Sequence, residues 1–250
     1  MERLVASPAC LPNMELEEVL RHYARLGFKK MEVFTYWAEA AFDYEEPPDR
    51  YLNLSERYDI DFTSLHLPPL GPESHSLEEV LRAARFCQEI GAEIAIFKAE
   101  SKKEYLRSGP KFLDAIEELG IDIQPVVENH SGTPISSLQD YREVLEGIDD
   151  LRMGAVLEVG HFHKVGIEWE DGYELLKDRI ALVHLKDMQG SISVPYGRGE
   201  IDFPKLFDLL EDGGYQGDYV VELEFERGMS EEEALEGLEK SLHYLNRFDL

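Results

Sequence analysis

Polar side chains follow short apolar runs at four places in the second half of the chain. They are Glu128 and His130 after the run IQPVV, Glu158 after MGAVL, His184 and Lys186 in ALVHLK, and Glu222 and Glu224 in YVVELE. If each run is a β-strand, residues two positions apart point to the same face, so the members of each pair lie together. Carboxylates that converge repel one another unless a proton or a cation lies between them. A divalent metal ion is the economical solution.

The ligands expected for that ion are Glu128, Glu158, His184 and Glu222. This oxygen-rich set suits Mn²⁺ or Mg²⁺ better than a thiolate-seeking ion, and Zn²⁺ and Co²⁺ are alternatives. The two cysteines of the chain lack metal-ligand spacing. We therefore expect a divalent metal cofactor, with Mn²⁺ as the first candidate.

The elements that would carry these residues alternate along the whole chain. Earlier strand candidates are LVAS near Leu4, MEVF near Met31, FTSLH ending at His66 and EIAIFK ending at Lys98, so about eight strands are expected. Stretches with apolar residues at helical spacing separate them. This alternation predicts an α/β fold, a (β/α)8 TIM barrel that forms a single domain over residues 1–250. An open doubly wound sheet is disfavoured, since no Gly-x-Gly-x-x-Gly turn follows the first strand.

Two of the helical patterns are LEEVLRHYARLG and SLEEVLRAARFCQEIG, the latter opened by a capping sequence at Ser76 and closed by Gly91. The other helices are expected at 48–58, 110–119, 138–145, 169–176, 203–210 and 230–245. In such a barrel the carboxyl ends of the strands carry the chemistry. The polar residues above therefore cluster where a site belongs.

The charge of the chain excludes some partners. Asp and Glu number 52 against 25 Lys and Arg, which gives a formal net charge of −27. Such a chain repels nucleic acid and anionic membranes. Neither a signal sequence nor an apolar run of about 18 residues is present, so a cytoplasmic protein is expected.

Four segments of the chain resemble the xylose-isomerase-like TIM-barrel superfamily, which includes the sugar phosphate isomerase/epimerase family and several dehydratases. They are VVENHSG (126–132), LEVGHFHKVG (157–166), LVHLKDMQGSISVPYGRGEIDF (182–203) and GGYQGDYVVELE (213–224). The segments cover the C-terminal half in order, and SLHLPP (64–69) adds support in the N-terminal half. The resemblance implies metal ligands at Glu128, Glu158, His184 and Glu222, although Glu158 stands where the family usually has Asp.

The same resemblance implies substrate contacts from His66, His161 and Lys186, with Arg198 able to reach a substrate oxygen or phosphate. Asp187 has the opposite parity from His184, which favours a role in capping the following loop.

The function expected is a metal-dependent isomerase or epimerase of a small sugar, keto-sugar or sugar phosphate, acting through an enediolate. Glu128 and Glu222 would be the catalytic residues that remove and return a proton. The alternative is a metal-dependent dehydratase of a cyclic polyol or keto acid such as inosose or 3-dehydroshikimate, with His130 and Lys186 as acid and base. A second alternative is a non-catalytic sugar-binding barrel. The partner expected is a small carbohydrate, and a homodimer is an open alternative to a monomer.

Overall fold

Eight parallel strands close into a barrel in the computed structural model, which describes residues 2–224, 230–248 and 250. The barrel strands are β1 (Leu4–Ala6), β2 (Lys30–Phe34), β3 (Asp61–His66), β4 (Ile94–Ile96), β5 (Gln124–Glu128), β6 (Gly154–Glu158), β7 (Ile180–Leu185) and β10 (Tyr219–Val221). Each strand pairs with its neighbour in the chain, and β1 pairs with β10 to close the ring. The predicted TIM barrel is confirmed.

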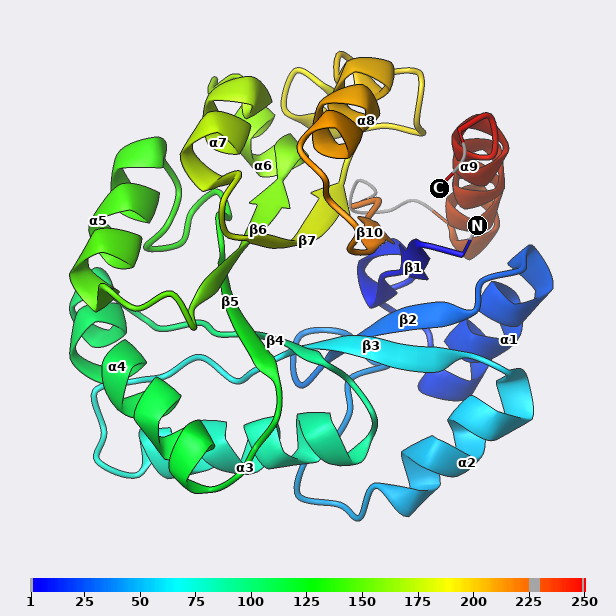
Figure 1. Cartoon of the computed structure of the whole chain (residues 1–250). Helices are drawn as coiled ribbons and strands as arrows, with labels where there is room; N and C mark the ends of the chain where they lie inside the picture. The colour runs from blue at the N-terminus through cyan, green and yellow to red at the C-terminus, as the bar shows by residue number, and fades with distance from the viewer. Residues whose placement is uncertain (1, 225–229, 249) are drawn as a thin grey trace.

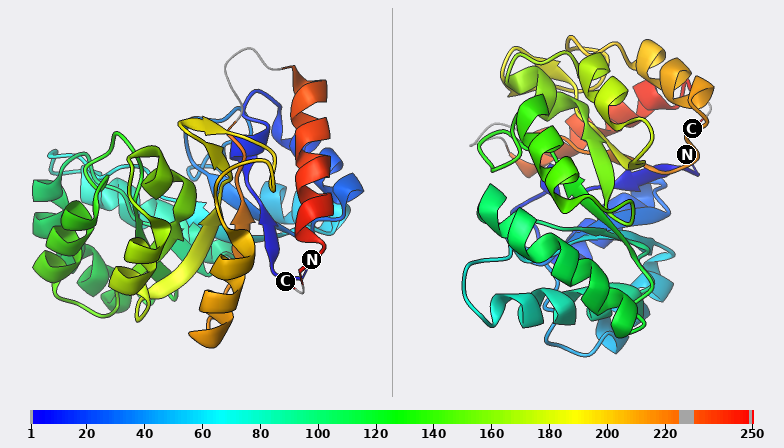
Figure 2. Two further views of the ribbon diagram at one scale, coloured as in Figure 1. Left: turned by 90° about the horizontal axis from the view of Figure 1, so that it is seen from above. Right: turned by 60° about the vertical axis from the view of Figure 1, so that its left-hand side comes forward.

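Helices surround the barrel on the outside (Figures 1 and 2). They are α1 (Leu16–Leu26), α2 (Asp49–Tyr58), α3 (Ser76–Glu89), α4 (Lys102–Glu118), α5 (Leu138–Ile148), α6 (Val159–Lys164), α7 (Trp169–Leu176), α8 (Phe203–Asp212) and α9 (Glu231–Leu245). A short 3-10 helix, η1 (Pro8–Cys10), follows β1, and a hairpin of β8 (Met188–Gln189) and β9 (Ile192–Ser193) follows β7. None of the helices in the described residues is long and apolar enough to cross a membrane.

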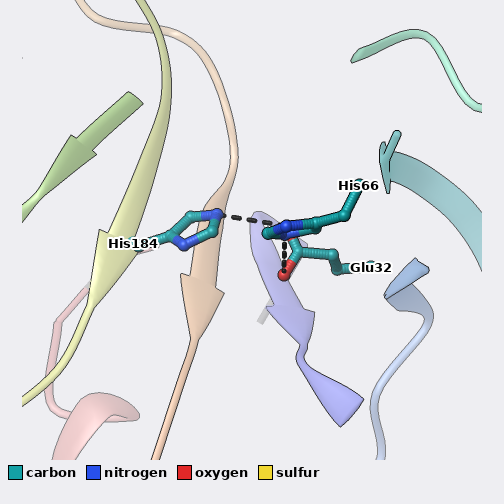
Figure 3. A group of neighbouring side chains, drawn as sticks. All are labelled: Glu32, His66 and His184. Atoms are coloured by element: carbon teal, nitrogen blue, oxygen red, sulfur yellow. Dashed lines mark ion pairs between the residues drawn. The ribbon is translucent and has the colours of Figure 1, made fainter. Parts of the chain in front are cut away.

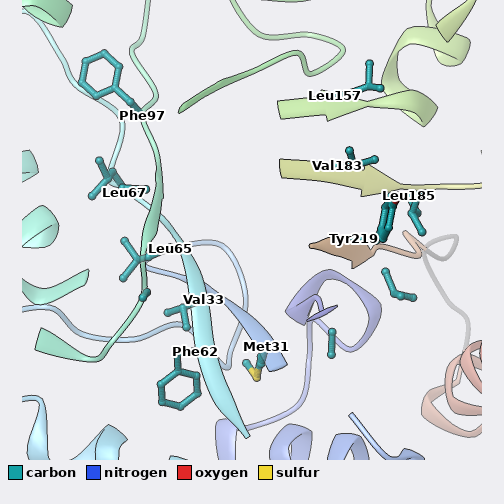
Figure 4. Close-up of a cluster of buried hydrophobic side chains, with 14 of the residues drawn as sticks. Met31, Val33, Phe62, Leu65, Leu67, Phe97, Leu157, Val183, Leu185 and Tyr219 are labelled. Carbon is teal, nitrogen blue, oxygen red and sulfur yellow. The ribbon is translucent and has the colours of Figure 1, made fainter. Parts of the chain in front are cut away.

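The apolar side chains form two layers because strand residues alternate between faces. Outward-facing residues such as Met31, Leu65 and Val183 pack against the helices (Figure 4). A smaller cluster fills the barrel interior, namely Val5, Ile96, Val126, Val156, Leu182 and Val220. The interior cluster closes the barrel below the strand ends, so polar residues can gather only above it.

Three helices differ from the expectation, and one of them, α6, lies where no helix was expected. Helix α4 begins at Lys102, well before the predicted 110–119, because Ser101 caps it by accepting a hydrogen bond from the Glu104 amide. Pro110 therefore lies inside the helix rather than at its start. In α3 the predicted cap is absent, since the Ser76 hydroxyl accepts a hydrogen bond from the Gly71 amide instead.

Candidate active site

The four predicted metal ligands lie directly above the interior apolar cluster. Glu128, Glu158, His184 and Glu222 each stand two positions after an interior residue, which is Val126, Val156, Leu182 or Val220. All four side chains are buried. The inward parity that the sequence predicted for these residues therefore matches the structure.

Three of the four side chains meet. Nδ1 of His184 lies 3.2 Å from Oε1 of Glu128 and 3.3 Å from Oε2 of Glu222. Burial lowers the pKa of His184, but Glu32, Glu128 and Glu222 outweigh burial and raise it well above its usual value. The carboxylates around His184 therefore favour a positively charged group at this point of the barrel.

The fourth predicted ligand points elsewhere. The Glu158 carboxylate caps α6, where one oxygen accepts from the Gly160 amide at 3.2 Å and the other accepts from the His161 amide. Burial raises the pKa of Glu158 to about 8, and Glu222 adds to the rise. Its one ion pair among the described residues is with Lys186, at 3.9 Å. The place of Glu158 in a coordination set stays a prediction.

The residues present fit a divalent cation. Among the described residues, Oε2 of Glu222 and both ring nitrogens of His184 are buried without a hydrogen-bond partner, although Nδ1 lies 3.3 Å from Oε2 of Glu222. Buried polar atoms without a partner are rare and call for an unseen water or ion. Two carboxylates and one imidazole suit Mn²⁺, Zn²⁺ or Co²⁺, and the identity of the metal stays a prediction.

Lys186 is held by a second network beside this cluster. Its ammonium lies 3.0 Å from Oε1 of Glu224, 3.5 Å from Oε2 of Glu222 and 3.1 Å from Nε2 of His161. Burial lowers the pKa of Lys186, but the surrounding carboxylates outweigh burial and raise it. Lys186 is therefore an ammonium.

His161 supports Lys186 with both of its ring nitrogens engaged. An ammonium only donates, so Nε2 of His161 accepts from Lys186, and Nδ1–H donates to Oγ of Ser131 at 3.0 Å. Burial and Lys186 lower the pKa of His161 to about 2. The predicted substrate contact from His161 stays a prediction, but in this structure the ring contacts protein groups.

His130 lies against His161, with ring centroids 3.7 Å apart. Its Nδ1 lies 2.9 Å from the carbonyl oxygen of Ser131, which can only accept, so Nδ1 carries the proton. Burial lowers the pKa of His130, which keeps the ring neutral. Its Nε2 therefore has a free lone pair.

His130, His161 and Glu224 also lie close enough to share an ion. The Lys186 ammonium already supplies positive charge there, because it contacts both His161 and Glu224. We therefore do not assign a metal to this group.

One further basic residue and one further acidic residue lie in the site. Nζ of Lys98, two residues after the end of β4, lies 2.9 Å from Oε2 of Glu128. Glu32, on β2, contacts His66 and His184 (Figure 3). The sequence argument missed Glu32, although its position inside MEVF, between outward-facing Met31 and Val33, is an inward one.

His66 and Arg198, both predicted to contact substrate, lie in different settings. His66 is buried on β3 and its Nε2 lies 3.1 Å from Oε1 of Glu32. Arg198 lies in the loop after β9 with its side chain exposed. Its contact with Asp187 is a hydrogen bond that its backbone amide donates. Both substrate contacts stay predictions.

Asp187 ties down that loop, as its parity suggested. Its carboxylate accepts hydrogen bonds from the amides of Met188, Gly197, Arg198, Gly199 and Ile201. Five amide donors on one carboxylate fix the path of the loop over the strand ends.

The loop after β2 places aromatic rings at the rim. Trp37 has a left-handed backbone (φ 79°) and its side chain is 63% exposed. Its ring packs edge-on against Phe34, which in turn packs edge-on against His66. A chain of rings therefore runs from solvent to the buried site.

This barrel, with its polar layer at the strand ends, is of the xylose isomerase-like class. The chain belongs to the xylose isomerase-like TIM barrel family, whose model matches residues 20–247.

Two relatives found by sequence are inosose dehydratases. Inosose dehydratase of Mesomycoplasma hyopneumoniae strain J is 25% identical, in an alignment that covers 93% of this chain and 88% of that protein. Inosose dehydratase of Geobacillus thermodenitrificans is 31% identical, over 44% of this chain and 43% of that protein. The chain thus spans less than half of this second relative.

Solved structures share the fold over nearly the full length. The IolI protein with a binding zinc atom has a TM-score of 0.77 at 18% identity, covering 99% of this chain and 100% of that one. The probable 3-DHS dehydratase AsbF from Bacillus anthracis has a TM-score of 0.74 at 13% identity, covering 98% and 99%. At these identities the likeness shows the fold alone.

The prediction of a sugar isomerase or epimerase is wrong. The sequence relatives are named inosose dehydratase, which supports the dehydratase alternative. The residues could not separate the two reactions, because both can begin by proton removal next to a carbonyl beside a metal ion. The catalytic roles expected of Glu128 and Glu222 stay predictions.

Proposed function

We propose that this protein is a divalent-metal-dependent lyase that removes water from a cyclic polyol ketone of the inosose class. The observation that carries the proposal is the pair of contacts from which the protonation of two side chains beside the metal ligands follows. His130 offers an unprotonated Nε2, and Lys186 offers an ammonium proton. An elimination needs one base and one acid, and His130 and Lys186 both contact the ring of His161.

The ion, held by His184, Glu128 and Glu222, would supply positive charge that stabilises negative charge on a substrate oxygen. Nε2 of His130 takes the proton from the carbon next to the carbonyl. The electrons of that C–H bond form the carbon–carbon double bond as the bond to the β-hydroxyl breaks. The departing oxygen takes a proton from Nζ of Lys186 and leaves as water.

The charges of the site favour an uncharged polyol over a keto acid. Lys98 is paired with Glu128, and Lys186 is paired with Glu222 and Glu224. A substrate carboxylate would have to compete with these protein carboxylates for each lysine, whereas hydroxyl groups can donate hydrogen bonds to the same carboxylates. A small carbohydrate therefore remains the proposed partner.

The test is product analysis with protein reconstituted separately with Mn²⁺, Co²⁺ and Zn²⁺. We expect the protein to dehydrate inosose, which NMR of the product would detect. Turnover of 3-dehydroshikimate should be much slower. A metal-loaded protein that dehydrates neither compound would refute the proposal and favour the alternative of a sugar-binding barrel.

A further inference from the structure

Glu32 is buried on the inward face of β2, and each of its carboxylate oxygens faces one imidazole and one hydroxyl. Oε2 lies 3.1 Å from Nε2 of His184 and accepts from Oγ of Ser64 at 3.1 Å. Oε1 lies 3.1 Å from Nε2 of His66 and accepts from Oγ of Ser7 at 3.4 Å. Figure 3 shows the carboxylate converging with the two imidazoles. Glu32 is therefore held from several sides.

The two ring nitrogens of His184 face different groups. Nδ1 faces Glu128 and Glu222, and Nε2 faces Glu32. A neutral imidazole carries its proton on one nitrogen and a lone pair on the other. A metal ion needs the lone pair, so the nitrogen turned away from the ion must carry the proton.

We propose that Glu32 is a positioning residue that holds His184 with its Nε2–H toward β2 and its Nδ1 lone pair toward Glu128 and Glu222. The inference rests on the metal dependence within the proposed function. Ser64 and Ser7 fix the carboxylate, which in turn fixes the ring. A carboxylate behind a ligating histidine orients the ring and raises its basicity.

The same three residues could be imagined as a metal centre of their own, because Glu32, His66 and His184 offer buried ligand atoms within 4.8 Å of one another. An ion there would occupy Nε2 of His184. Nδ1 could then bind a second ion, beside the carboxylates of Glu128 and Glu222, only if the ring also lost its remaining proton. One ring supporting one ion avoids that cost, so we assign Glu32 to support and leave the second centre as an outcome of the test.

The experiment titrates metal-free protein with Mn²⁺ and follows the free ion by electron paramagnetic resonance. We expect one ion per chain for the wild type and binding weaker by about 10- to 100-fold in Glu32→Gln, whose amide removes the charged acceptor but keeps the shape. Glu104→Gln is the matched control, because Glu104 is another buried carboxylate, paired with Arg107 on α4. Its Mn²⁺ affinity should equal that of the wild type.

The position of the proton gives a second readout. In the Zn²⁺-loaded wild type, ¹⁵N NMR should show the proton of His184 on Nε2. Ser64→Ala removes one hydroxyl donor to Glu32, and we expect Mn²⁺ binding weaker by about two- to tenfold. This milder variant decides the question if circular dichroism shows that Glu32→Gln does not fold.

Four results would overturn the inference. The first three are wild-type affinity in folded Glu32→Gln, or in Ser64→Ala when Glu32→Gln is unfolded; a proton on Nδ1; and two ions per wild-type chain with one lost in Glu32→Gln. A wild-type chain that binds none of Mn²⁺, Co²⁺ and Zn²⁺ also overturns it. Tight Mn²⁺ binding that depends on Glu32, without dehydration of inosose, would refute the proposed function and leave this inference standing.

Discussion

The ammonium of Lys186 lies 3.1 Å from Nε2 of His161, and both side chains are buried. Because Lys186 can only donate, this contact fixes His161 as a neutral ring that donates from Nδ1 to Ser131. His161 therefore holds the ammonium of Lys186 in place through Nε2.

Replacing Lys186 tests its role as the acid. We expect Lys186→Met to lower kcat for inosose dehydration by about 10²- to 10⁴-fold, the usual contribution of general acid catalysis. The measurement is steady-state kinetics on metal-loaded protein, with the folded fraction checked by circular dichroism. Lys205→Met is the control, since Lys205 is exposed on α8 and pairs with Glu170. A kcat near the wild-type value would contradict the assignment.

Glu158 is expected to matter for stability through α6. Glu158→Ala removes the side chain that accepts the amides of Gly160 and His161, and should lower the free energy of unfolding by about 1 kcal/mol. Glu158→Asp should retain most of that stability, because Asp is a preferred N-cap residue. Urea unfolding measures both. Wild-type stability of Glu158→Ala would show that the cap contributes nothing.

Asp187 should control the order of the loop after β7. Asp187→Asn places a side-chain amide where the carboxylate accepts hydrogen bonds from backbone amides. The change should lower the free energy of unfolding by about 2 kcal/mol. Trypsin should then cleave after the exposed Arg198 faster than in the wild type. Asp212→Asn, an exposed change at the end of α8, is the control and should leave the cleavage rate unchanged.

Asp140 should make part of the stability depend on pH. Partial burial raises the pKa of Asp140, but hydrogen bonds from Lys102, Ser137 and Ser136 outweigh burial and lower it to about 2. A carboxyl whose pKa falls on folding stabilises the protein above the unfolded value, about 3.9, and loses that effect as pH falls toward 2.

Asp140→Asn should therefore be less stable than the wild type near neutral pH, by about 1 kcal/mol for a lost capping interaction. The difference should shrink as the pH approaches 2. Urea unfolding of both proteins over this range measures it, and a constant difference at every pH would contradict the argument.

Much of the site follows from strand parity alone. Glu128, His184 and Glu222 stand two positions after interior residues, and the alternation of short apolar runs with helical patterns was enough to predict both the barrel and the inward faces. The cytoplasmic location and the exclusion of nucleic acid stay predictions, and the homodimer stays an open alternative.

Two features could not be predicted in this way. The direction of the Glu158 side chain depends on α6, which begins directly after β6. A helix of six residues is too short to show a helical pattern of apolar residues in the sequence. Glu32 was overlooked because it lies within its strand rather than at the end. Its partners come from β3 and β7, and only the closed barrel brings these strands to face it.

The two tryptophans of the chain differ in access to solvent. Trp37, at the rim, is 63% exposed, whereas Trp169, on α7, is 4% exposed beneath the ammonium of Lys205. Acrylamide should therefore quench the fluorescence of Trp37 and leave that of Trp169 nearly unchanged. Since rings connect Trp37 to His66, its emission should report binding of the proposed polyol without any added dye.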